Sequence, residues 1–176
     1  MSAKHVLLFL AAAMMLFAAS ADAALYKFDV FMDGAQESPP VATTGMGTAM
    51  VLFDDVSGMM DVDGSFSGLI GSTTASHIHC CAPLGMNAGV VIPLTVTPLG
   101  GTSGTVTGSG TIAMASIPSV LAGLSYLNVH SNFRPGGEIR GQLVGPMLIP
   151  EPGSAALLAI GFSGLFAVRR RSRRAA

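Results

Sequence analysis

The central part of this sequence has little positive charge. Between residues 24 and 149 the basic side chains are Lys27, Arg134 and Arg140, and eight acidic side chains oppose them. Nucleic acids bind to surfaces that are rich in Lys and Arg, so an acidic segment of this kind is a poor partner for them. We therefore expect no nucleic-acid binding.

The sequence also lacks the motifs by which common enzyme classes are recognised. It has no nucleophile elbow, no phosphate-binding loop and no paired-carboxylate motif. Ser, His and Asp residues occur along the chain, but without geometry they cannot be combined into a catalytic site. We expect a protein that is not an ordinary hydrolase and that acts without catalysis.

Hydrophobic runs are short as well, and none reaches the roughly 20 residues of a comfortable membrane span. Near the N-terminus, Lys4, the apolar run 6–19 and Ala21-Asp22-Ala23 have the order of a secretory signal peptide. We predict that residues 1–23 are a signal peptide, which signal peptidase removes after Ala23. The alternative is an uncleaved membrane anchor.

The C-terminal part has three elements in order. Pro150-Glu151-Pro152 breaks the chain, residues 153–168 are almost wholly apolar, and a basic tail starts with Arg169, Arg170 and Arg171. This order resembles the PEP-CTERM sorting signal of Gram-negative bacteria that make extracellular polymer. Sixteen helical residues span roughly 24 Å, so the apolar run is a short transmembrane stretch whose arginines stay in the cytoplasm.

The resemblance implies a route for the protein. It implies export, a transient anchor in the inner membrane with the domain facing the periplasm, and cleavage near Pro-Glu-Pro by an exosortase-type enzyme. The protein would then reach the cell surface or the extracellular space, where extracellular polymer is a possible partner. A permanent tail anchor is the alternative.

The middle of the chain has the pattern of short strands. Apolar and polar residues alternate, or β-formers cluster, between turn residues, and this predicts about eight strands and an all-β sandwich. The domain is expected to cover residues 24–148, and 149–176 to form the sorting segment. The expected strands are 26–30, 47–53, 60–67, 73–79, 90–96, 105–113, 126–130 and 138–144.

Two further expectations concern details of this domain. A single connecting helix is predicted at 116–123, with Ser116 as its cap and Gly123 as its stop. Met50, Met59 and Met60 are expected to fill the core.

Four motifs occur in a recognisable order and together resemble the CHRD domain of bacterial secreted proteins. The resemblance implies an antiparallel Greek-key β-sandwich and no settled activity. This sequence departs from the common pattern at Cys80 and Cys81, which follow the second motif. The motifs are Gly34-Ala35-Gln36-Glu37-Ser38-Pro39-Pro40, Ser76-His77-Ile78-His79, Tyr126-Leu127-Asn128-Val129-His130 and Arg134-Pro135-Gly136-Gly137-Glu138-Ile139-Arg140-Gly141-Gln142.

His77 and His79 are candidate metal ligands. Residues two apart in a strand face the same side, so both imidazoles should project together while Ile78 points into the core. His130 is a third candidate, and zinc or copper would suit such ligands. Copper/zinc superoxide dismutase also has a His-x-His on a sandwich strand, which is an analogy of geometry alone. The alternative is three structural histidines without a metal.

Other polar residues near these motifs have open assignments. Glu138 and Arg140 are expected either to form an ion pair that pins their hairpin or to orient His130. Glu37 is expected to stabilise a turn. Cys80 and Cys81 can form a vicinal disulfide, supply thiolates to a metal or crosslink to another molecule.

Two functions are consistent with these features. The first is an exported, surface- or matrix-associated binding module without enzymatic activity. The second is a secreted metal-binding or redox protein that uses His77, His79 and His130.

We predict that the mature chain begins at Ala24. Lys4→Glu should impair export without altering the folded domain, because the n-region charge acts only during targeting. Intact-mass measurement of the periplasmic protein tests this, and a mass that includes residues 1–23 would contradict it.

Overall fold

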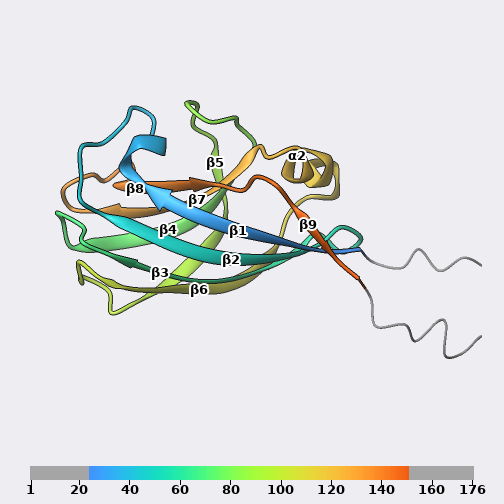
Figure 1. Ribbon diagram of the computed structural model, residues 1–176, viewed down its shortest axis with the longest axis horizontal. Coiled ribbons are helices and arrows are strands. Elements are labelled where there is room, and N and C mark those ends of the chain that lie inside the picture. The colour runs from blue at the N-terminus through green and yellow to red at the C-terminus, as the bar shows by residue number, and fades with distance from the viewer. Residues whose placement is uncertain (1–23, 151–176) are drawn as a thin grey trace, which may run out of the picture.

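Strands dominate residues 24–150, which are the residues that the computed structural model describes (Figure 1). The predicted all-β class is confirmed, while the predicted targeting helices in 1–23 and 153–168 lie outside the described residues. One α-helix, α2 (Ile117–Leu121), and two 3-10 turns, η1 (Gly34–Gln36) and η2 (Met114–Ser116), join the strands. The strands are β1 (Leu25–Asp33), β2 (Met46–Asp54), β3 (Met59–Ser67), β4 (Thr73–Cys80), β5 (Gly89–Thr97), β6 (Gly104–Thr111), β7 (Ser125–Ser131), β8 (Ile139–Gln142) and β9 (Met147–Ile149).

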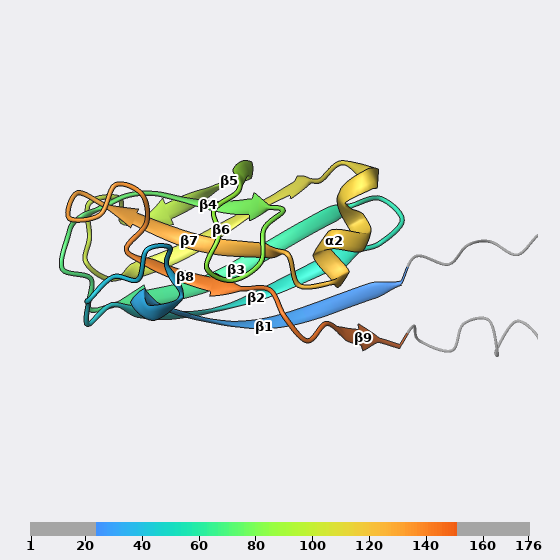
Figure 2. The ribbon, with the colours of Figure 1, turned by 90° about the horizontal axis from the view of Figure 1, so that it is seen from above.

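Eight of these strands form one closed antiparallel sheet. Its order is β2-β3-β6-β5-β4-β7-β8-β1, and β1 pairs with β2 again, which closes the ring. Because β3 lies beside β6 and β7 lies beside β4, the meander β4-β5-β6 belongs to two Greek keys, as the sequence predicted. Figure 2 shows the sheet wrapped around its interior, with β1 and β2 on one side and β4 and β5 on the other.

The short strand β9 was not predicted. It extends the sheet beyond β1 by pairing Met147 with Lys27 and Ile149 with Leu25. The start of β1 and the end of β9 therefore lie side by side at one end of the sheet (Figures 1 and 2). Within residues 24–150 the structure has no helix that is both long and apolar enough to cross a membrane.

Buried and exposed residues alternate along the strands, and the buried ones form the hydrophobic core. Inward side chains from all eight strands of the ring meet inside, and each large buried side chain contributes about 1.5–3 kcal/mol through removal from water. The expectation for the methionines was right only for Met60, which is fully buried. Met59 is its neighbour along β3 and must face the other way, so it is 43% exposed; Met50 is 40% exposed.

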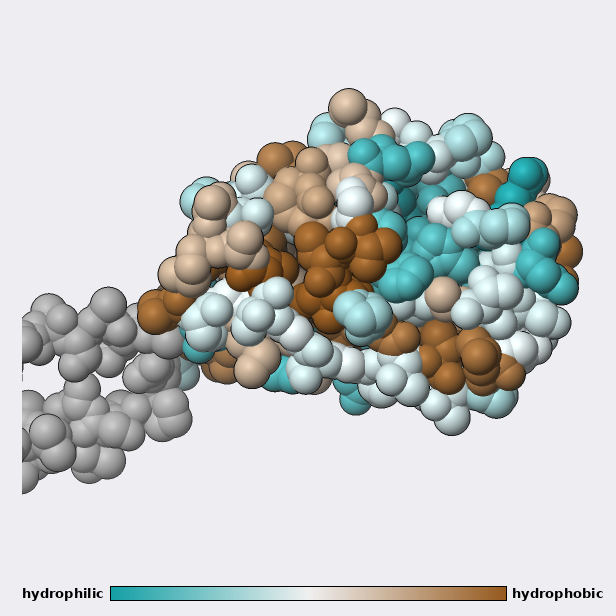
Figure 3. Space-filling view, turned by 180° about the vertical axis from the view of Figure 1, so that it is seen from behind, coloured by the Kyte–Doolittle hydropathy of each residue, from teal (hydrophilic) through white to brown (hydrophobic). Residues whose placement is uncertain are grey.

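Apolar side chains also remain on the outer surface. On the face shown in Figure 3, brown hydrophobic patches lie beside teal hydrophilic side chains. Exposed apolar residues of this kind are common in folded proteins and do not by themselves mark a binding surface. They occur in the described strands and in the loops between them.

The connecting helix is shorter than predicted. Gly123 has a φ of +77°, a conformation that glycine adopts easily, and it follows the helix end as expected. Ser116, however, makes no side-chain cap. It belongs to η2 and is already in a helical conformation, whereas a capping residue normally has extended backbone angles.

Glu138 fastens two loops to the sheet. Its carboxylate accepts hydrogen bonds from Thr43 Oγ1 at 2.6 Å, the Ile70 amide at 2.6 Å and the Gly71 amide at 3.1 Å, and also from the Ser131 hydroxyl. Burial opposes ionisation, but these donors outweigh it and lower the pKa of Glu138 below its ordinary value. The residue is therefore a structural anchor.

Glu138→Gln should destabilise the domain by about 2–4 kcal/mol, because the new amide nitrogen would face groups that themselves donate. The lowered pKa means that the carboxylate stabilises the fold above pH 4.5 and loses this effect as pH falls. Urea unfolding at pH 7 and at acid pH measures both effects. Asp63→Asn, on an exposed position of β3, is the matched control; equal stability of the two variants would contradict the assignment.

Candidate metal centre

The three predicted histidines lie on the outer face of β4 and β7. Ile78 is fully buried in the core, as are Leu127 and Val129, so the residues that alternate with them project outward. This outward face is nonetheless largely buried. Loops 34–45 and 81–88 supply hydrogen-bond partners to Arg140 and Gln142 on the neighbouring strand β8, and they cover a layer of polar groups outside the hydrophobic core.

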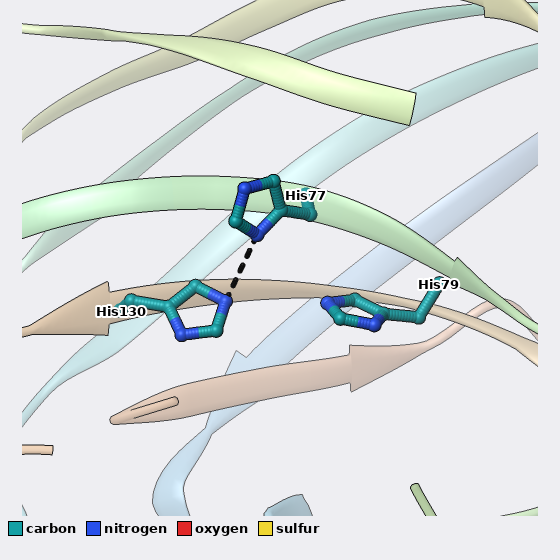
Figure 4. Close-up of side chains that lie close together, drawn as sticks. All are labelled: His77, His79 and His130. Atoms are coloured by element: carbon teal, nitrogen blue, oxygen red, sulfur yellow. Dashed lines mark hydrogen bonds between the residues drawn. The ribbon is translucent and has the colours of Figure 1, made fainter. Parts of the chain in front are cut away.

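Strand register brings the histidines together. His77 stands opposite Asn128, and His79 stands opposite Tyr126, so His130 is the next outward residue beyond Asn128. Figure 4 shows the three rings converging from the two strands, with a hydrogen bond between His77 Nδ1 and His130 Nε2 at 3.0 Å. One nitrogen from each ring lies within 4.8 Å of the others.

The backbone orients two of the rings. His79 Nδ1 lies 2.9 Å from the Ala88 carbonyl, and His130 Nδ1 lies 2.8 Å from the Pro135 carbonyl. A carbonyl oxygen only accepts, so both Nδ1 atoms carry a proton and both Nε2 atoms of the neutral rings carry a lone pair. This is the arrangement in which a ligand histidine is held by a partner at its other nitrogen.

All three rings favour the neutral form. Burial lowers the pKa of His77, and the charges that His130 and His79 would carry lower it further. Burial also lowers the pKa of His79 and of His130, although their carbonyl partners oppose this shift. Neutral imidazole is the form that binds a metal, so the cluster is prepared for one at neutral pH.

Arg140 contacts the same Tyr126 ring that stacks on His79. The Tyr126 ring stacks on His79 with centroids 4.7 Å apart, and the Arg140 guanidinium lies 3.5 Å from the centroid of the same Tyr126 ring. Arg140 also donates to the carbonyls of Met86 at 2.8 Å and Pro83 at 3.2 Å. It thereby holds the loop that presents Ala88 to His79.

Both predicted roles that linked Glu138 to its neighbours are wrong. Glu138 does not pair with Arg140, whose side-chain acceptor is Gln142 Oε1 at 2.6 Å. Glu138 does not orient His130 either, because Pro135 does so. The reason is that β8 begins at Ile139, so Glu138 lies in the preceding turn and its carboxylate is directed to the loops near Thr43 and Ile70.

Asn128 and Glu37 belong to the site but were not predicted there. Asn128 is 2% exposed, and its Oδ1 lies 3.1 Å from His79 Nε2. Glu37 is 5% exposed, and burial raises its pKa to about 7 although Arg140, the Ser38 amide and the Asn128 side chain lower it. Both residues stand inside the motifs, but no local pattern shows that these motifs meet.

Cys80 and Cys81 form a disulfide at the end of β4. A disulfide has no thiolate, so in this state the pair does not supply ligands to the histidines. The donor set is therefore nitrogen-based.

Three neutral imidazoles fit zinc or copper. In a tetrahedral zinc site, ligand nitrogens about 2.0–2.1 Å from the ion are about 3.3 Å apart. The His77–His130 separation of 3.0 Å is close to this value, and the 4.8 Å limit for the full set requires the rings to move closer around an ion.

Comparison with known families agrees with this reading of the chain. The CHRD domain model matches residues 28–143, and the model of the PEP-CTERM protein-sorting motif matches residues 148–173. Neither a curated protein nor a solved structure shows significant similarity to the chain. The sorting motif indicates an exported protein that an exosortase-type enzyme processes and that reaches the cell surface or the extracellular space. With about two thirds of its length matched, the chain belongs to the CHRD domain family.

Proposed function

We propose that this protein binds a divalent transition metal outside the cell through His77, His79 and His130, and that it acts as a binding module rather than an enzyme. The observation that carries the proposal is the convergence of three ring nitrogens within 4.8 Å from two strands. Zinc and copper are the candidate metals, because both accept several imidazole ligands.

The surroundings of the rings support this function. Carbonyls of Ala88 and Pro135 fix the ring orientation of His79 and His130, so little side-chain freedom is lost on binding. The ligands also come from adjacent strands of a closed sheet, which is a more rigid support than a loop.

The location is part of the proposal. Processing after Ala23 and near Pro150-Glu151-Pro152 would leave a unit of about the predicted domain, 24–148. The Ala24 amide donates to Asp55 Oδ1 at 2.8 Å, so the proposed new N-terminus already has an anionic partner next to β2. The metal would therefore be held by a folded module at the surface, where association with extracellular polymer stays a prediction.

Zinc and copper titrations of the domain should show one saturable site. His77→Ala with His79→Ala should abolish binding and leave the sheet folded, because both rings lie outside the hydrophobic core. His130→Ala should weaken binding by about tenfold or more, since one of three ligands is lost. Calorimetry measures the affinities and circular dichroism the fold.

Asp29→Asn with Asp63→Asn is the matched control. These carboxylates lie on exposed positions of β1 and β3, away from the histidines, and their loss should not change the affinity. If the unmutated domain shows no saturable binding at micromolar metal, the histidines are structural and the proposal fails.

The affinity should depend on pH in one direction. Protons compete for the ring nitrogens only when pH falls below the lowered pKa values of the three histidines, so binding should be constant above pH 6.5 and weaken below it. Calorimetric titrations between pH 5 and 8 measure this, and affinity that rises on acidification would contradict it.

A further inference from the structure

Two acceptor atoms face each other beside the histidine cluster. His79 carries its proton on Nδ1, which donates to Ala88, so its Nε2 has a lone pair. Only 3.1 Å away lies Asn128 Oδ1, which also has only lone pairs. Such a pair repels unless a proton or a cation lies between the two atoms.

The surroundings of Asn128 explain why its side-chain oxygen faces His79. Asn128 Nδ2 and Glu37 Oε1 both border the space beside Gly137, so the amide nitrogen lies on the Glu37 side and Oδ1 on the His79 side. Gly137 leaves the space for this arrangement, since a side chain there would collide with both Glu37 Oε1 and Asn128 Nδ2. Asn128 is therefore held with its oxygen toward the cluster.

The strand register brings Asn128 close to the other two histidines as well. Asn128 stands directly opposite His77 in the β4–β7 register and precedes His130 by two residues on the same outward face. An oxygen donor in this position can complete a four-ligand set, because zinc commonly has four ligands of nitrogen, sulfur or oxygen type.

We propose that Asn128 Oδ1 is the fourth protein ligand of the metal and that Glu37 is the positioning residue that aims it. This inference rests on the function proposed above, and it defines an N₃O site instead of three imidazoles with a solvent ligand.

Charge explains why Glu37 has this place. Three imidazoles and one amide are neutral, and Arg140, which stands opposite Asn128 in the β7–β8 register, adds positive charge nearby. A divalent ion would thus lack compensation from its ligands. Glu37 is a buried carboxyl group in contact with one of these ligands, and its Oε1 has no hydrogen-bond partner among the described residues. Negative charge on Glu37 would stabilise the ion through the amide.

Cobalt titration of the folded domain tests the inference, because Co²⁺ occupies zinc-type sites and its visible spectrum reports ligand number and type. Asn128→Ala should weaken Co²⁺ binding by about tenfold or more and change the visible bands, since solvent would replace the amide oxygen. Asp61→Ala, on an exposed position of β3, is the control and should leave affinity and spectrum unchanged.

Glu37→Gln separates positioning from folding. It should weaken Co²⁺ binding by about tenfold and leave the visible bands in place, because the ligand remains but its orientation and the nearby charge are lost. Glu37→Gln with Asn128→Asp should restore the affinity to the unmutated level or above, because the new carboxylate binds the ion and the Gln amide can donate to it.

The outcomes distinguish the inference from the proposed function. Absence of saturable Co²⁺ binding by the unmutated domain would overturn both. Saturable binding with the same affinity and bands in Asn128→Ala would overturn the role of Asn128 and leave a three-histidine site. A Glu37→Gln variant that changes thermal stability but not Co²⁺ affinity would show that Glu37 acts only on the fold.

Discussion

The loops over β4, β7 and β8 bury a layer of polar side chains, and each of those groups must find a hydrogen-bond partner inside the protein. Arg140, which is fully buried, donates through its two terminal nitrogens to two carbonyls of loop 81–88 and to Gln142, while its Nε has no partner among the described residues. Gln142 in turn donates to Ala82 and Gly123. These bonds hold loop 81–88 in place. The Ala88 carbonyl therefore lies within hydrogen-bond distance of His79 Nδ1 and orients that ring in the candidate centre.

The same burial determines the chemistry of the site. Exclusion of water keeps the histidines neutral at neutral pH and raises the pKa of Glu37 to about 7. The contact of His79 Nε2 with Asn128 Oδ1, at 3.1 Å, lies within the same buried layer. The second carboxyl group of the region, Glu138, has four donors, which come from two loops and from the end of β7. Two buried acids thus have separate roles because one is fully hydrogen bonded and the other is not.

Much of the fold could be predicted because it follows from local patterns. Alternation placed Ile78 in the core and the two flanking histidines outside it, and turn residues separated the eight strands of the ring. Local patterns failed to predict elements whose formation depends on a neighbouring segment of the folded chain. Strand β9 exists because β1 offers an edge at Leu25–Lys27, and Ser116 fails to cap α2 because η2 precedes the helix without a break.

By itself, the sequence determined the strand faces, the family, the sorting motif and the three candidate ligands, since each depends on residue type and short spacing. Only the tertiary structure decided which polar groups meet. Glu138 was expected next to Arg140 because residues two positions apart share a strand face, yet one lies in a turn and the other in β8. Glu37 is 91 residues from Asn128, and no period in the chain links them. Their contact exists because closing the sheet brings loop 34–45 over β7, and burial then leaves each side chain few possible partners.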